Sequence, residues 1–432
     1  MKKPLVPESA ELRITHLGRS GDGVATHNGT NVFVPYTLPD EQVAVDIFRR
    51  KKQPATGRLK KVITPAPSRR AAPCQHFGVC GGCALQHMTP DTYDAWKTGL
   101  VLHELERAGI TAETVQPMRI SPEGARRRVV FSARKFRDGQ LSVGFNERGA
   151  HWLVDVKQCI VVKSAIAGLL APLRILLDAL LQPSDKTDIA VTWFPEGLDV
   201  VLLGLPRLEW EDRERLAAFA RDNKLARLSI RARKIKDRDP IYTSNMPSCT
   251  FGDMVVHPPA GSFLQATTEG EAAMGDCIHT AIKKYAPGVF SKKDGRFADL
   301  FAGCGTFSGV LAAYGNVLAV ESEGDSLAAL TNAKHMRIAT RAQDLFADPL
   351  LPAELNTFDV VVFDPPRAGA KTQAEQLAQS KVPLVIGISC NAETFARDAK
   401  ILMDGGYTFR ELTPVDQFLY SPHVEVVGVF TR

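Results

Sequence analysis

The sequence predicts a multidomain protein that ends in a doubly wound α/β domain. Its 432 residues, of which 44% are hydrophobic, suffice for two or three separate cores. Short apolar runs separated by turn residues fill residues 1–64 and predict a small OB-like β-barrel. In residues 256–432 apolar strands alternate with helical segments, which predicts a parallel sheet with helices on both faces. The intervening residues 65–255 have a mixed α+β pattern.

The N-terminal segment carries an excess of positive charge. Residues 1–73 contain 13 Lys or Arg against 6 Asp or Glu, a balance of +7 in a chain whose net charge is +5. This asymmetry predicts a polyanion-binding end, although a solvated basic surface would give the same counts. The segments Gly18–Ala25 and Val32–Glu41 resemble a TRAM domain, an OB-like RNA-binding barrel. A proline-rich linker, Thr64–Pro73, follows this predicted barrel.

Three cysteines with interspersed glycines follow the linker, at Cys74, Cys80 and Cys83. Cys159 is the nearest candidate for a fourth ligand. Structural zinc usually uses two Cys-x2-Cys pairs, and only one such spacing exists here. Three clustered cysteines and a distant fourth therefore favour an iron–sulfur cluster, while zinc and unliganded thiols stay open as alternatives.

The central segment is expected to contain both helices and strands. Helices are predicted over 91–109 and 169–181, and strands over 129–133, 141–145, 189–205 and 228–232. The basic runs at 49–52, 126–128 and 231–234 are candidates for holding an RNA backbone. No run of about 18 apolar residues occurs and the N-terminus lacks an apolar signal core, so we expect a cytoplasmic protein without a membrane span.

The segment Asp299–Leu311 reads as a strand, a glycine turn and the start of a helix. Gly303 and Gly305 allow positive φ and a close approach of a ligand to the backbone. The third glycine comes one residue later than in a dinucleotide-binding G-x-G-x-x-G, which favours S-adenosylmethionine. Glu321 ends the next predicted strand, where an acid commonly holds a ribose. A plain α/β connection without a ligand remains the alternative.

Two further strands are expected to deliver polar side chains to the same edge of the sheet. Asp364 follows Val360–Phe363 and precedes two prolines that turn the chain off the strand. Arg367 stands where amino-group methyltransferases place an aromatic residue, which disfavours methylation of an exocyclic amine. Cys390 follows Leu384–Ser389. Taken alone it would be read as a core cysteine.

A thiol and an acid at this edge fit one particular chemistry. Thiolate addition to carbon 6 of uracil makes carbon 5 nucleophilic, and a base must later remove the proton from carbon 5. Glu425, at the start of the last apolar strand, could be that base or a solvated edge residue. Gln265 offers a donor and an acceptor to a cofactor. Phe263 could stack on a base, although a buried core position is the usual reading of a single Phe.

Together these residues resemble the S-adenosylmethionine-dependent RNA 5-methyluridine methyltransferases, in particular the RumA-type 23S rRNA enzymes with a TRAM domain and an iron–sulfur cluster. The resemblance implies that Cys390 is the nucleophile and Glu425 the base. It implies cofactor-binding roles for Gln265, Phe301, Glu321, Asp344 and Asp364, and a 4Fe–4S cluster on Cys74, Cys80, Cys83 and Cys159. The chain departs from the family at Thr306, where Asn is frequent, and at Gln265–Thr267, where Asn usually follows the Gln closely.

The expected activity is methyl transfer from S-adenosylmethionine to carbon 5 of a specific uridine in 23S rRNA, through a covalent Cys–uracil adduct, by a monomeric enzyme. A base in folded RNA would have to be extruded into the pocket. The same chemistry on a tRNA loop and a non-catalytic RNA-binding protein are the alternatives. A radical methylthiotransferase is disfavoured because its Cys-x3-Cys-x2-Cys motif is absent.

Overall fold

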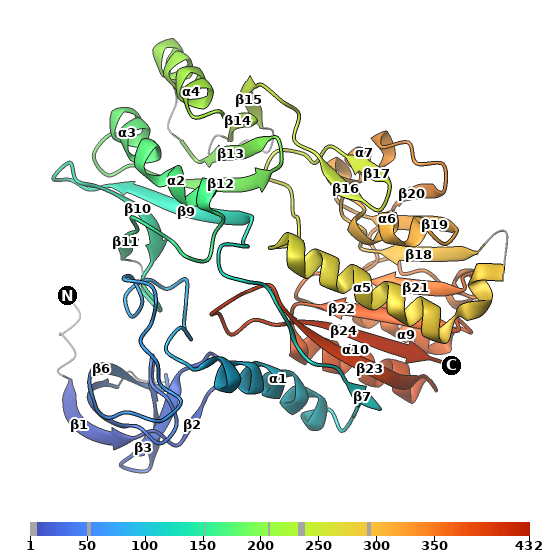
Figure 1. Cartoon of the computed structure of the whole chain (residues 1–432), viewed down its shortest axis with the longest axis horizontal. Coiled ribbons are helices and arrows are strands. Elements are labelled where there is room, and N and C mark those ends of the chain that lie inside the picture. Colours follow the sequence, from blue (N-terminus) through green and yellow to red (C-terminus); the bar gives the residue numbers. More distant parts are fainter. Residues whose placement is uncertain (1–6, 50–52, 151, 206–207, 232–237, 292–294) are drawn as a thin grey trace. The chain divides into compact units, whose positions relative to one another are not determined.

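The computed structural model describes residues 7–49, 53–150, 152–205, 208–231, 238–291 and 295–432 (Figure 1). Parts of two predicted basic runs, residues 50–52 and 232–234, lie outside the described residues. The chain divides into two compact units. The first comprises Met1–Leu100, Phe145–Val154 and Phe418–Pro422, and the second comprises Val101–Gly144, Asp155–Gln417 and His423–Arg432. None of the helices in the described part of the chain combines the length and apolar content needed to span a bilayer.

The first unit contains the predicted N-terminal β-structure. Its strands are β1 (Glu8–Arg13), β2 (His16–Leu17), β3 (Gly23–His27), β4 (Thr30–Val34), β5 (Gln42–Phe48) and β6 (Ala55–Thr64). They form one sheet in the order β1-β5-β6-β4-β3-β2, in which β4 and β6 are parallel and the other neighbours antiparallel. Alternating aliphatic side chains, among them Val32, Val34, Val43 and Val45, form its buried core.

The central segment forms a seven-stranded sheet in the order β11-β10-β9-β12-β13-β14-β15. Its strands are β9 (Arg128–Lys135), β10 (Leu141–Asn146), β11 (Leu153–Asp155), β12 (Lys186–Phe194), β13 (Gly197–Leu203), β14 (Arg227–Arg231) and β15 (Asp239–Thr243). The helices of this part of the chain are α1 (Pro90–Arg107), α2 (Ser164–Gly168), α3 (Leu170–Leu180) and α4 (Trp210–Asp222). The prediction of one strand over 189–205 was wrong, because the chain reverses at Pro195 and Glu196, just before Gly197 with φ 135°, and forms the antiparallel pair β12–β13.

The C-terminal part forms a nine-stranded sheet in the order β20-β19-β18-β21-β22-β24-β23-β7, with β8 also pairing with β23. Its strands are β7 (Thr114–Val115), β8 (Arg119–Ile120), β18 (Arg296–Leu300), β19 (Asn316–Glu321), β20 (Ile338–Ala342), β21 (Val360–Phe363), β22 (Leu384–Ser389), β23 (Thr408–Asp416) and β24 (Glu425–Thr431). The intervening helices are α5 (Thr268–Tyr285), η1 (Pro287–Ser291), α6 (Thr306–Ala312), α7 (Gly324–Asn332), α8 (Pro352–Leu355), α9 (Lys371–Gln379) and α10 (Ala392–Asp404). A short hairpin, β16 (Cys249–Phe251) and β17 (Met254–Val256), precedes α5.

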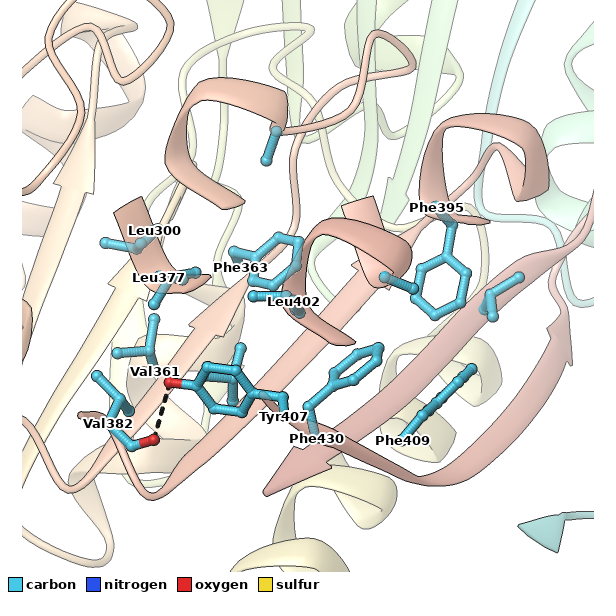
Figure 2. Packing of buried hydrophobic residues seen from close by; sticks show 14 of the residues in the cluster. Leu300, Val361, Phe363, Leu377, Val382, Phe395, Leu402, Tyr407, Phe409 and Phe430 are labelled. Atoms are coloured by element: carbon cyan, nitrogen blue, oxygen red, sulfur yellow. Dashed lines mark hydrogen bonds between the residues drawn. The ribbon is translucent and has the colours of Figure 1, made fainter. Parts of the chain in front are cut away.

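Helices cover both faces of the nine-stranded sheet, as predicted. On one face Ile278 of α5 and Leu311 of α6 pack against Val360 and its neighbours. On the other face Leu377 of α9 and Leu402 of α10 pack against residues that alternate with those of the first core. Figure 2 shows this second core, in which the Phe409 and Phe430 rings stack 4.5 Å apart. Its buried Tyr407 hydroxyl donates to the Val382 carbonyl at 2.9 Å.

The nine-stranded sheet differs from the predicted all-parallel arrangement at β24, the last strand in the chain. Strands β18 to β22 pair in parallel, whereas β24 is antiparallel to both β22 and β23. The connection between β23 and β24 contains no crossover helix, and a short connection allows only an antiparallel return. Consequently the start of β24 lies beside the end of β22, with Val426 opposite Ser389. This reversal brings Glu425 to the edge where β22 delivers Cys390.

Candidate active site

The turn between β18 and α6 has an unusual backbone. Phe301, Gly303 and Gly305 all have positive φ, at 64°, 55° and 90°. A Cβ on Gly305 would lie 2.5 Å from a methyl carbon of Leu330, so packing as well as φ requires glycine there. A Cβ on Gly303 would meet nothing within 4 Å. The turn therefore presents open backbone at Gly303.

Glu321, at the end of β19, is held by the backbone around this turn. Its Oε2 accepts a hydrogen bond from the Gly303 N–H at 2.8 Å. Its Oε1 accepts from the N–H groups of Ser322 and Glu323, both at 2.7 Å. These three donors fix the carboxylate next to the glycine turn.

Asp299 lies within β18 and is fully buried. Its Oδ2 accepts from the Ser308 hydroxyl at 2.6 Å, while Oδ1 has no hydrogen-bond partner among the described residues. Burial raises the pKa of Asp299 to about 7, against the hydrogen bond from Ser308. No role was predicted for Asp299, although an acid inside an apolar strand is a signal that could have identified it.

Asp344 lies on the exposed loop after β20. Its Oδ1 accepts from the Phe346 N–H at 3.0 Å. The rings of Phe346 and Phe301 have centroids 5.4 Å apart. The loop after β20 thus meets the glycine turn through an aromatic pair.

A connected set of buried and half-buried polar groups lies at the edge formed by β21, β22 and β24. Gln265 donates through Nε2 to Asp364 Oδ2 at 3.0 Å. Gln417 donates through its own Nε2 to Gln265 Oε1 at 2.7 Å and to Glu425 Oε1 at 2.9 Å. We call Gln265, Asp364, Cys390 and Glu425 the sheet-edge cluster. Gln417 was missed because no motif or periodicity marks it.

The two acids of the sheet-edge cluster have strongly shifted pKa values. Burial raises the pKa of Asp364 to about 7, against a hydrogen bond from Gln265. Burial and, to a smaller extent, the charge of Asp364 raise the pKa of Glu425 to about 8, while Gln417 and Arg367 oppose the shift. Two acids that share a site in this way are typical of acid–base chemistry.

Cys390 follows β22 and is half-buried. Burial raises the pKa of its thiol to about 11, with further contributions from Glu425 and Asp364. The Arg367 side chain counters this shift through its charge and a hydrogen bond. Arg367 Nη2 lies 3.4 Å from Nε2 of the exposed His423, and the Arg367 carbonyl accepts from Asn391 Nδ2 at 3.1 Å. A cationic side chain therefore stands next to the thiol.

The loop that carries Gln265 is anchored from the seven-stranded sheet. Arg127 Nε donates to the Gln265 carbonyl at 3.0 Å, and Arg127 forms a buried ion pair with Glu271. Phe263 is 65% exposed, so the reading of this residue as a core Phe was wrong. The Arg128 guanidinium carbon lies 4.8 Å from the centroid of the Phe263 ring. A pair formed by an exposed aromatic ring and a half-buried guanidinium therefore borders Gln265.

The predicted metal ligands do not form a recognisable site in the described residues. Cys74, Cys80 and Cys83 lie in the first compact unit and Cys159 in the second, and all four are free of disulfides. Over the described ranges, no group of three or more His, Cys, Asp or Glu side chains is arranged to hold a metal ion. The iron–sulfur cluster stays a prediction.

Comparisons with known proteins agree with this architecture. The TRAM domain family model matches residues 8–60, and the model for tRNA (uracil-5-)-methyltransferases matches residues 350–432. An uncharacterized RNA methyltransferase of Caulobacter vibrioides is 39% identical over 434 residues, covering 98% of this chain and 100% of that protein. The 23S rRNA (uracil(1939)-C(5))-methyltransferase RlmD of Halomonas elongata is 33% identical over 428 residues, covering 96% of this chain and 88% of that protein.

A solved structure shares the fold along almost the whole chain. The tRNA (uracil-54, C5)-methyltransferase of Pyrococcus abyssi, in complex with S-adenosyl-L-homocysteine, matches with a TM-score of 0.75 at 21% identity, covering 98% of this chain and 99% of that one. The relatives by sequence extend over both compact units and the sheet edge described above. The chain belongs to the family of S-adenosylmethionine-dependent RNA (uracil-5-)-methyltransferases.

Proposed function

We propose that this enzyme methylates carbon 5 of a specific uridine in 23S rRNA through a covalent adduct with Cys390. The observation that carries the proposal is the meeting of Cys390, Glu425 and Asp364 at one edge of the nine-stranded sheet. Burial is the main cause of the raised pKa of each of the three groups, and the charges of neighbouring acids add to it at Cys390 and Glu425.

Cys390 is the proposed nucleophile. Its thiolate adds to carbon 6 of the uracil and forms a C–S bond, and the displaced π electrons become an enolate with electron density on carbon 5. Because the thiol's pKa is raised to about 11, the thiolate needs local stabilisation. Arg367, which already lowers this pKa through its charge and a hydrogen bond, supplies that stabilisation.

Glu425 is the proposed general base. S-adenosylmethionine supplies the methyl group, after which carbon 5 carries both that methyl and a proton. Glu425 accepts the proton, the C–H electron pair restores the double bond between carbons 5 and 6, and the sulfur leaves as thiolate. A carboxyl with a pKa near 8 is a stronger base than an ordinary glutamate, which suits this step.

The glycine turn and its neighbours are the proposed cofactor site. Open backbone at Gly303 and the carboxylate of Glu321 suit the ribose side of an adenosine. The Phe301–Phe346 pair, next to Asp344, suits the adenine ring. Gln265 and Asp364, which are hydrogen-bonded to each other, complete the proposed set of cofactor contacts on the side of the sheet-edge cluster.

Ribosomal RNA is the proposed substrate because the Halomonas elongata relative acts on 23S rRNA. A tRNA loop is the second candidate, favoured by the description of the family model that matches the C-terminal region. In both cases the uridine must leave its stack to reach Cys390. The N-terminal excess of positive charge suits the surrounding RNA backbone. Arg127 of the basic run at 126–128 is buried in its ion pair with Glu271, so the prediction that the whole run holds the RNA backbone was wrong for this residue.

Four further parts of the proposal rest on the sequence. A 4Fe–4S cluster is proposed to be held by Cys74, Cys80, Cys83 and Cys159, since four thiolates are the donor set that such clusters prefer. No catalytic step is assigned to the cluster. The division into segments 1–64, 65–255 and 256–432, the cytoplasmic location and the monomeric state are proposed together with it.

The test uses RNA that contains 5-fluorouridine, from which no base can remove the fluorine. Wild-type protein with S-adenosylmethionine should form a stable protein–RNA adduct, and Cys390→Ala should form none. Equal adduct from both proteins would show that Cys390 is not the nucleophile.

Labelled methyl transfer into separate 23S rRNA and tRNA pools lacking 5-methyluridine distinguishes the two substrates. Iron and sulfide analysis of anaerobically purified protein tests the cluster, which the finding of zinc instead would refute.

A further inference from the structure

The side-chain amide of Gln417 connects the hydrogen bonds around the sheet-edge cluster. Gln417 follows β23 and is 2% exposed. Its Oε1 accepts a hydrogen bond from the backbone N–H of Ala266 at 2.7 Å. Because a backbone N–H can only donate, this contact determines which end of the amide is oxygen and which is nitrogen.

The orientation of Gln417 in turn orients two functional side chains. Its Nε2 donates one hydrogen to Gln265 Oε1 and the other to Glu425 Oε1. Gln265 must then present its own Nε2 to Asp364, as it does at 3.0 Å. One backbone N–H thus sets the direction of every hydrogen bond in the series.

Packing holds Gln417 in this position. Gly270, in the first turn of α5, lies so close that an added Cβ would be 2.8 Å from the Gln417 Cβ. The Gly270 N–H is bound by the Thr267 hydroxyl, which fixes this turn of the helix. A buried amide with tight packing and all its donors engaged has little freedom to rotate.

The contact with Gln417 makes the two oxygens of Glu425 different from each other. Oε1 is engaged by the amide, whereas Oε2 is buried and has no hydrogen-bond partner in the part of the chain that the structure describes. Among the described residues no donor engages the lone pairs of Oε2, whereas Gln417 occupies one lone pair of Oε1.

We propose that Gln417 is a positioning residue for the base step: it holds Glu425 through Oε1, so that Oε2 accepts the proton from carbon 5. This inference rests on the proposed role of Glu425 as the base. In that step the proton passes to Oε2, the C–H electron pair forms the double bond between carbons 5 and 6, and the C–S bond breaks with its pair returning to Cys390. Donation from Gln417 also stabilises the carboxylate form of Glu425.

The charged and titratable groups that act on Glu425 come from two neighbouring segments. Asp364 follows β21, Arg367 lies three residues further on, and Cys390 follows β22. Asp364 disfavours the carboxylate of Glu425, whereas Arg367 and Gln417 favour it. Without the donor of Gln417, ionisation of Glu425 should require a higher pH.

The test is Gln417→Met, which keeps the length of the side chain and removes the amide. With uridine RNA and S-adenosylmethionine, multiple turnover should fall roughly tenfold or more, as for loss of a hydrogen bond to a charged group. The methylated covalent adduct should accumulate, and the alkaline rise of the pH–rate profile should move to higher pH. With 5-fluorouridine RNA, which stops before the base step, the variant should form adduct to the same extent as wild type.

Ser121→Ala is the matched control. It removes a buried hydrogen bond between Ser121 Oγ and Thr267 Oγ1, which lie 2.8 Å apart, without touching the Gln417 amide. It should leave the pH profile unchanged and accumulate no methylated adduct. Turnover by Gln417→Met at the wild-type rate, or reduced turnover without adduct accumulation, would overturn the proposal. Absence of any 5-fluorouridine adduct with wild-type protein would instead overturn the proposed function.

Discussion

Two buried glutamates, one in each compact unit, have opposite electrostatic surroundings. Glu41 in the first unit is completely buried, and Arg69 donates to both of its oxygens. The N–H groups of Leu38 and Ala66 also donate to it, at 2.9 Å and 3.4 Å. Although burial raises the pKa of Glu41, these donors outweigh it and the pKa lies below its ordinary value.

Glu425 in the second unit is equally buried but has one amide donor and, within the described residues, an oxygen without a partner. Its pKa rises to about 8. This difference fits the proposed roles of the two carboxylates. Glu41, whose oxygens both have donors, is expected to stabilise the fold, whereas Glu425 keeps a lone pair for the proposed base step at a cost in stability.

The largest change in turnover is expected for Glu425→Gln. The variant loses the base but keeps the shape of the side chain, so multiple turnover should fall by about 10²- to 10⁴-fold. The free energy of unfolding should stay the same or increase, because a poorly solvated acid has been removed. Turnover and denaturant-induced unfolding measure the two effects. Wild-type turnover would contradict the role of Glu425.

Glu41→Gln should have the reverse pattern. Removal of one partner of a buried ion pair leaves Arg69 without its counterion and should lower the free energy of unfolding by about 3 kcal/mol. Methyl transfer by the protein that remains folded should be nearly unchanged, since Glu41 and Glu425 belong to different units. Denaturation curves that overlay those of wild type would show that the pairing of Glu41 does not stabilise the fold.

The two glutamates should also respond to pH with opposite signs. The pKa of Glu425 rises from its ordinary 4.5 to about 8 on folding, so between these values only the unfolded state is ionised and stability falls as pH rises. The pKa of Glu41 is lowered on folding, so its stabilisation is present above pH 4.5 and is lost as pH falls through the folded pKa.

Unfolding of wild type and both variants from below pH 4.5 to about pH 8 checks these signs. The stability of Glu425→Gln relative to wild type should increase from about pH 5 to about pH 8. The deficit of Glu41→Gln should shrink towards acid pH. Parallel pH curves for all three proteins would contradict both pKa assignments.

The smallest effect is expected for Asp40→Asn, next to Glu41 in sequence. Asp40 also has an arginine partner, Arg13 at 2.9 Å, but both side chains are about 70% exposed. Because solvent screens such a pair, the free energy of unfolding should change by less than about 0.5 kcal/mol. A loss as large as that of Glu41→Gln would mean that charge pairing, and not burial, explains the behaviour of Glu41.

The parts of the site that end apolar strands could be predicted from the sequence. Asp364 and Cys390 each follow an uninterrupted apolar run, and the carboxyl ends of parallel strands meet at one edge. Glu425 was placed at the same edge, but the reversal of β24 that brings it there was not predicted. The alternation of apolar residues in a strand does not show in which direction the chain runs relative to its neighbours. Only the short connection after Asp416 indicated that β24 is antiparallel.

The interactions that hold these residues could not be predicted. Gln417 and Gln265 are far apart in sequence, and their contact depends on the packing of Gly270 against the end of β23. The positive φ of Phe301 is likewise invisible in a sequence, because residues other than glycine rarely adopt it. Hydrogen bonds between distant segments follow from the fold, and local patterns do not record them.

The most direct test of the central claim is the intact mass of Glu425→Gln protein after incubation with uridine RNA and S-adenosylmethionine, followed by nuclease digestion. If Cys390 attacks carbon 6 and Glu425 removes the carbon 5 proton, the variant should carry one methylated uridine nucleotide, and peptide mapping should place it on Cys390. An unmodified protein that nevertheless lacks turnover, or a nucleotide attached at another residue, would contradict this mechanism.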